Sequence, residues 1–138
     1  MAILAAVVIP QVSEAVENAK ESAMLADLHQ LTTAIERYKI QHDGLPPDDM
    51  NNNTLSQLTQ KTDAYGTYDP GGEYGPYVLN EIPPNPLNGD QRIYRTSTVP
   101  PKLLQRRTGW IYYPETGQIW AGEGPPALLK AAAAKSIP

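Results

Sequence analysis

The stretch that decides the fold is residues 2–43, which read AILAAVVIPQVSEAVENAKESAMLADLHQLTTAIERYKIQHD. Only Pro10 interrupts its helical character, and Gly44 followed by two prolines is a strong stop signal for a helix. In its second half, apolar residues alternate at spacings of four and three, which places them on one helical stripe: Met24, Leu28, Leu31, Ile35 and Tyr38. The sequence therefore predicts one long helix over this stretch.

The predicted helix is too long to be buried by the rest of the chain. It would measure roughly 60 Å, whereas a compact domain of 138 residues has a radius of gyration of about 14 Å. We therefore expect the C-terminal half of the helix to pack on the rest of the protein and the N-terminal half to project. The expected contacts to the sheet are made by Leu28, Leu31, Ile35 and Tyr38.

The projecting half begins with an apolar stretch, Ala2–Ile9, whose larger side chains are Ile3, Leu4, Val7, Val8 and Ile9. A helix that is apolar on every face is buried in protein or in lipid. The stretch is far shorter than the about 20 residues of a membrane span, and it lacks the basic start and cleavage site of a signal peptide. It is typical of part of a longer apolar helix.

Pro10 leaves two alternatives open. Inside the helix it would remove one backbone hydrogen bond and crowd the preceding turn. Alternatively it is the first residue of a helix that begins there, and the apolar residues before it form a disordered tail.

The second half of the chain is rich in proline and glycine and predicts loops and short strands. Thr54–Leu58 indicates a short helix with Asn53 or Thr54 as its cap. Residues 63–90 are expected to form an ordered loop, packed down by its tyrosines and by three aliphatic side chains: Val78, Leu79 and Ile82.

Three strands are expected late in the chain, at Gln91–Thr98, Thr108–Tyr113 and Gly117–Ala121. The last two are typical of a hairpin, because Pro114–Gly117 suits a type I turn with a bulge. One helix on a small antiparallel sheet is an α+β fold. The expected organisation is a long helix over 1–44 with a projecting arm at 2–12, a globular region over 45–126 packed on helix residues 24–43, and a C-terminal tail at 127–138.

The residues give little support for catalysis or for a metal site. No cysteine is present, and the two histidines, His29 and His42, are expected on different faces of the helix and in solvent. Asp48 and Asp49 could ligate a hard cation, although a solvated loop is the favoured interpretation. A basic cluster consists of Lys102, Arg106 and Arg107, but the net charge of −4 does not favour nucleic acid as a partner. The chain is predicted not to be an enzyme.

The apolar stretch, together with Pro10 and Gln11, is very similar to the second half of the conserved N-terminal segment of type IV pilins and pseudopilins. Further phrases resemble the major pseudopilin of type II secretion: Asp43–Pro46, Thr54–Leu58, Tyr74–Tyr77, Ile82–Pro86 and Gly109–Tyr112. The resemblance implies a pilin-like fold, with a long N-terminal helix packed on a small antiparallel sheet.

The resemblance further implies a structural subunit of a periplasmic pseudopilus that supports type II protein secretion. The alternatives are a type IV pilus subunit, acting in adhesion, motility or DNA uptake, and a soluble binding module. Family members lose a basic leader and then begin with a methylated residue, usually phenylalanine, soon followed by a glutamate. None of these is present here, so we expect a truncated, soluble form of a protein that resides in the inner membrane and periplasm at full length. Its implied partners are further copies of itself, the inner membrane and the secretion or pilus assembly machinery.

One feature of the family is not carried over. Many major pseudopilins hold calcium in a C-terminal loop with paired acidic residues, whereas residues 114–126 offer only Glu115 and Glu123. We therefore expect no cofactor, although calcium stays an open alternative. Were calcium to bind, we would look to three aspartates of the central loop: Asp63, Asp69 and Asp90.

Overall fold

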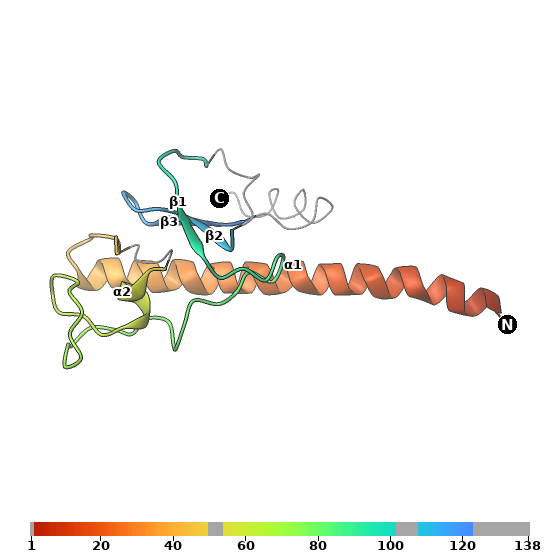
Figure 1. Cartoon of the computed structure of the whole chain (residues 1–138), viewed down its shortest axis with the longest axis horizontal. Helices are drawn as coiled ribbons and strands as arrows, with labels where there is room; N and C mark the ends of the chain where they lie inside the picture. Colours follow the sequence, from red (N-terminus) through yellow and green to blue (C-terminus); the bar gives the residue numbers. More distant parts are fainter. Residues whose placement is uncertain (1, 50–53, 102–107, 123–138) are drawn as a thin grey trace.

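The protein is one long helix lying against a small sheet (Figure 1). The computed structural model describes the backbone of residues 2–49, 54–101 and 108–122, and side chains from residue 15 onward within these ranges. The elements follow in the order α1 (Ala2–Gln41), α2 (Ser56–Thr59), β1 (Ile93–Arg95), β2 (Trp110–Tyr113) and β3 (Gln118–Ala121). The expected α+β arrangement, with a long N-terminal helix packed on a small sheet, is confirmed.

Helix α1 begins before Pro10 and ends at the predicted stop. Because the helix starts at Ala2, Pro10 lies inside it rather than at its first position. At the other end, Asp43 and Gly44 take φ values of 56° and 79°, and the N–H of Gly44 donates to the carbonyl of Lys39 at 2.7 Å. A left-handed glycine that returns to the last turn is a common helix ending.

The sheet is mixed, with strand order β1-β2-β3. Strands β2 and β3 pair antiparallel as expected, but β1 runs parallel to β2, with Ile93 opposite Trp110. The prediction of an antiparallel sheet is therefore wrong for β1. Residues 96–109 connect the two strands, and a connection of this length can cross back to the same end of the sheet before β2 begins.

The β2–β3 hairpin closes where its turn chemistry predicts. The N–H of Gly117 donates to the carbonyl of Tyr113 at 2.9 Å, and Gly117 has a φ of 83°. A Cβ at this position would also lie 3.0 Å from Ile35 and 3.2 Å from Pro46. The glycine thus lets the turn bend and lets it sit directly on α1.

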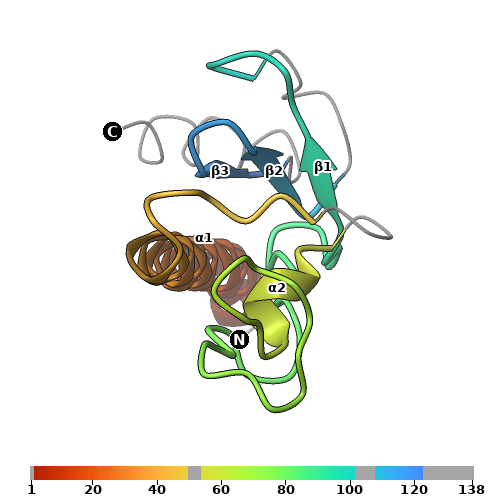
Figure 2. The same ribbon diagram turned by 90° about the vertical axis from the view of Figure 1, so that its left-hand side faces the viewer.

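The core lies between α1 and the sheet, which covers one side of the helix (Figure 2). From α1 it takes Leu31, Ile35 and Tyr38, all buried, whereas Leu28 is only partly buried. From the sheet and the loops it takes Leu55, Leu58, Val78, Ile82, Ile93, Trp110, Tyr112 and Ile119. Each such side chain stabilises the fold by about 1.5–3 kcal/mol relative to exposure.

Two expectations for the middle of the chain are wrong. The N-cap of α2 is Leu55, without a side-chain hydrogen bond, and not Thr54; Asn53 lies outside the described residues. Leu79 does not pack the loop down, because it is 78% exposed while Val78 is buried. A buried glutamine holds α2 in place, since Gln57 accepts from the N–H groups of the segment after α1 and donates to the carbonyl of Gly66.

Candidate functional site: the projecting helix and the groove beside it

The N-terminal part of α1 extends well beyond the globular body (Figure 1). Residues 15–20 are all exposed, and the first buried side chains along the helix are Glu21 and Met24. The body therefore covers the helix only from about Glu21 onward. The six positions expected to form a filament or membrane contact lie in the projecting backbone, and their side chains are outside the described part: Ile3, Leu4, Val7, Val8, Ile9 and Pro10.

Within the described residues, no helix combines the length and the apolar character that crossing a membrane requires.

His42 is buried, contrary to the expectation of a solvated histidine, whereas His29 is exposed as expected. The ring of His42 stacks on that of Tyr38, with the ring centroids 3.8 Å apart and the ring planes at 11° to each other. Nδ1 lies 2.8 Å from the carbonyl of Tyr38, and Nε2 lies 3.1 Å from both the hydroxyl of Thr62 and the carbonyl of Asp63. The signal was present in the sequence, because His42 follows Tyr38 by four residues and continues the buried stripe.

The His42 cluster is a structural anchor between the end of α1 and the loop after α2. In the described part of the chain both ring nitrogens are engaged with loop or helix groups, which leaves neither nitrogen free to bind a metal. Burial, and to a lesser degree the nearby Asp48, raises the pKa of Tyr38 to about 12. Burial thus disfavours ionisation of the phenol, and the cluster serves packing.

The three aspartates that were considered for calcium each hold their own loop. Asp63 accepts from the N–H of Tyr65 at 2.9 Å, and Asp69 accepts from that of Gly71 at 3.0 Å. Asp90 accepts from the N–H of Arg92 at 2.8 Å and from its guanidinium at 2.7 Å, and this side-chain hydrogen bond lowers the pKa of Asp90. Such turns stabilise loops locally.

No group of three potential metal ligands occurs among the residues whose placement is described. Asp49 accepts a hydrogen bond from the hydroxyl of Ser56. Glu115 accepts from the hydroxyl of Tyr113 at 2.6 Å, and Glu123 lies outside the described residues. So do the basic cluster Lys102, Arg106 and Arg107 and the tail at 127–138.

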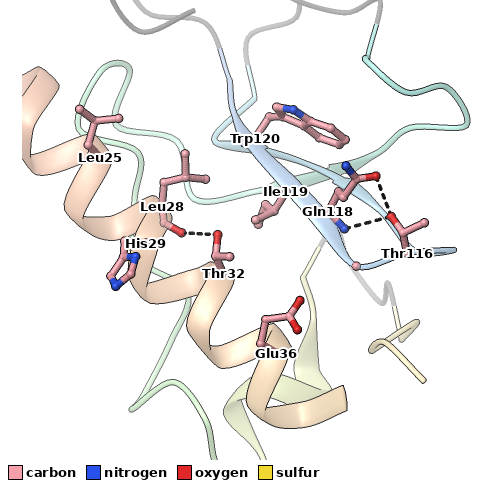
Figure 3. A pocket seen from close by; sticks show the side chains of 10 residues that line it. Leu25, Leu28, His29, Thr32, Glu36, Thr116, Gln118, Ile119 and Trp120 are labelled. Atoms are coloured by element: carbon pink, nitrogen blue, oxygen red, sulfur yellow. Dashed lines mark hydrogen bonds between the residues drawn. The ribbon is translucent and has the colours of Figure 1, made fainter. Parts of the chain in front are cut away.

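A groove of about 390 Å³ runs between α1 and β3 (Figure 3). One wall is a single face of α1, from Leu25 to Glu36, and the other is the hairpin from Thr116 to Trp120. Its volume is in the range of ligand-binding clefts. Reasoning from the sequence missed this groove, because its walls come from segments about eighty residues apart, as the 77-residue separation between Lys39 and Thr116 illustrates.

Comparison with known proteins adds no relative: no protein-family model, no curated protein and no solved structure matches this chain. A function therefore has to be argued from the apolar N-terminal stretch, the projection of α1 and the groove beside it.

Proposed function

We propose that this protein is a pilin-like filament subunit, in which α1 joins copies and the globular body faces outward. The observation that carries the proposal is the reach of α1. The helix has 40 residues, and the body covers it only from about Glu21 onward. The uncovered part contains the apolar stretch Ala2–Ile9.

In a single copy of the protein, the uncovered part of α1 has no tertiary packing from the described residues to stabilise it. Short helices are marginal in water without tertiary packing, and burying apolar surface contributes roughly 25 cal/mol per Å². Neighbouring copies that pack their arms together would remove this surface from water and hold the helices straight. We infer a structural role, not a catalytic one.

Among filaments, we favour the pseudopilus of type II secretion over a type IV pilus. This preference rests on the phrases after the helix, such as Asp43–Pro46 and Gly109–Tyr112, that resemble the major pseudopilin. In this role the subunit would assemble with copies of itself and with the secretion machinery at the inner membrane.

The test uses the absence of native cysteine, which makes every introduced thiol unique. Two variants are compared, Val8→Cys in the arm and Leu79→Cys on the body, where the side chain is 78% exposed. We expect association that rises with concentration in sedimentation, and oxidation should link Val8→Cys copies but not Leu79→Cys copies.

A charge provides the matched control. Val8→Asp should abolish the association because it places a carboxylate in the packed arm, whereas Leu79→Asp should leave it unchanged. If Val8→Asp forms the same stable oligomer as the original chain, the contact lies in the globular body and the proposal fails.

A further inference from the structure

Strand β3 is an edge strand, and its open side faces the groove. Among the described residues, β3 pairs with β2 alone. The sheet residues that line the groove come from β3 and the turn before it, Thr116–Trp120, and none comes from β2. The groove therefore follows the free edge of the sheet, with α1 as its opposite wall (Figure 3).

The ladder shows which backbone groups point into this open side. Gly122 donates to the carbonyl of Gly109 at 2.9 Å, and Gly117 donates to that of Tyr113 at the other end. Hydrogen-bonded pairs alternate along an antiparallel ladder, so Trp120 bonds to Ile111 within the sheet. The N–H and C=O groups of Ile119 and Ala121 point away from β2, and within the described part of the chain nothing bonds to them.

The dimensions of the groove suit an extended peptide. From Leu25 to Glu36 the helical wall covers about 16 Å at 1.5 Å per residue, which is the span of about five residues of strand. A rounded small molecule would leave the ends of this trough empty and could not satisfy alternate backbone groups. An added strand satisfies them by main-chain hydrogen bonds.

The side chains that line the groove differ between its two ends, and this difference predicts how an extended ligand is oriented along it. Leu25 and Leu28 give the helical wall an apolar end, near Trp120 of β3, whereas Glu36 lies at the end near Thr116; between the two ends Ile119 points from β3 toward the helix (Figure 3). Among the described lining residues Glu36 is accompanied by no lysine or arginine. Lys39 lies beside this end: its Nζ donates to the carbonyl of Thr116 at 3.2 Å and forms a surface pair with Glu36 at 3.5 Å. The surface pair is weak and leaves the carboxylate further acceptor capacity.

We propose that this groove binds an extended segment of a partner protein, which adds to β3 as an antiparallel strand. A strand antiparallel to β3 enters at the Trp120 end and leaves at the Glu36 end. The segment therefore carries apolar residues first and a basic residue last. This inference does not depend on filament formation, because the groove lies on the globular body.

The probe is the blocked peptide acetyl-TVTVTR-amide, which alternates apolar and polar residues and ends in arginine. In NMR titrations of the whole chain we expect saturable shifts centred on the amides of Ile119 and Ala121, together with slower hydrogen exchange at both. The dissociation constant should be near 100 μM, about the strength of a short exposed peptide contact. Absence of binding at about 1 mM peptide overturns the proposal.

Methylated peptides test the strand geometry without altering the protein. One form carries N-methyl groups on both valines and the other on the two threonines after them. Only alternate residues of an edge-paired strand donate to their neighbour, so one form should lose binding about tenfold or more and the other should retain it. Equal affinity of the two forms contradicts strand addition.

A charge exchange tests the direction. Glu36→Lys should weaken TVTVTR and bind TVTVTE better, whereas Glu73→Lys, an exposed control on a distant loop, should do neither. If Glu36→Lys has no effect, the assigned direction is wrong. If the amides of Ile119 and Ala121 are instead protected only as the chain dimerises, a second copy fills the groove and the partner proposal falls.

Discussion

At the scale of single residues, the buried face of α1 combines aliphatic packing with one aromatic cluster. Leu31 and Ile35 have no exposed surface, and Tyr38 stacks on His42 where the helix ends. Beside this buried stripe, Glu36 and Lys39 form a surface pair. Buried and surface side chains of one helix should therefore differ sharply in their contribution to stability.

Leu31→Ala should destabilise the protein by about 2–5 kcal/mol, because it removes a fully buried side chain and leaves a cavity. Glu36→Ala is the matched surface change and should stay within about 0.5 kcal/mol. Urea unfolding of both variants measures the difference. Small and equal effects would show that the stripe faces another molecule instead of the sheet.

Stability should fall at high pH. Burial, then Asp48, raises the pKa of Tyr38 to about 12, and burial also raises that of Tyr112, whose hydroxyl donates to the carbonyl of Pro47 at 2.6 Å. In the unfolded chain, a tyrosine has its ordinary pKa of about 10. Above that pH the unfolded state has released protons that the folded state still binds. The stability that these phenols contribute is therefore complete below about pH 10 and is lost as the pH rises through about 12, the pKa of Tyr38 in the folded state.

Urea midpoints of the original chain and of Tyr38→Phe, taken between about pH 8 and pH 11, measure this loss. The variant should show a shallower decline because it lacks one titrating phenol. Identical slopes would mean that Tyr38 ionises as readily in the folded state as in the unfolded state.

At the scale of elements, the loops are held by buried amide side chains. Asn85 is completely buried; its Nδ2 donates to the carbonyls of Gly109 at 2.7 Å and Gly122 at 3.3 Å, and its Oδ1 accepts from the N–H of Leu87 at 2.9 Å. One side chain thus joins the loop before β1 to the open end of the hairpin, where β2 begins and β3 ends. Gln57 does the same for α2 and the segment after α1.

Asn85→Ala should cost at least about 2 kcal/mol, because it removes three buried hydrogen bonds, including the one that satisfies the N–H of Leu87. Asn18→Ala, on an exposed position of α1, should change stability by less than about 0.5 kcal/mol. Thermal or urea unfolding compares the two. A negligible effect at Asn85 would mean that water replaces its hydrogen bonds.

A chelator should leave the melting curve unchanged. Asp63, Asp69 and Asp90 each accept from the backbone of their own loop, so they stabilise three separate turns instead of converging on one cation. Melting curves recorded with EDTA and with added calcium provide the measurement. A fall in melting temperature with EDTA that calcium reverses would disprove this prediction.

At the scale of the whole molecule, the shape is elongated because α1 continues beyond the body (Figure 1). A straight helix of 40 residues measures about 60 Å, although the sheet and loops cover only its C-terminal part. The projection that we propose to join copies thus also determines the dimensions of the free subunit.

Small-angle X-ray scattering extrapolated to zero concentration should give a radius of gyration well above the value of about 14 Å that is expected for a compact domain of this length. The extended arm supplies the excess. Scattering at rising concentration serves as the control for association. A radius of gyration of about 14 Å would show that the arm folds back on the body in solution.

Much of this molecule follows from neighbouring residues alone. The long helix, its end at Gly44 and the turn at Gly117 were all predictable, because helical periodicity and turn chemistry depend on residues only a few positions apart. The apolar character of the arm also follows from the sequence, and it supports the proposed function together with the reach of α1.

The tertiary structure decided what depends on distant partners. It paired β1 parallel to β2, because the path of a long connection is not encoded in the strands that it joins. It buried His42 against Thr62, twenty residues away, and left Leu79 exposed. It also formed the groove between α1 and β3, since only the packing of the hairpin on the helix brings Glu36 and Trp120 to one cleft.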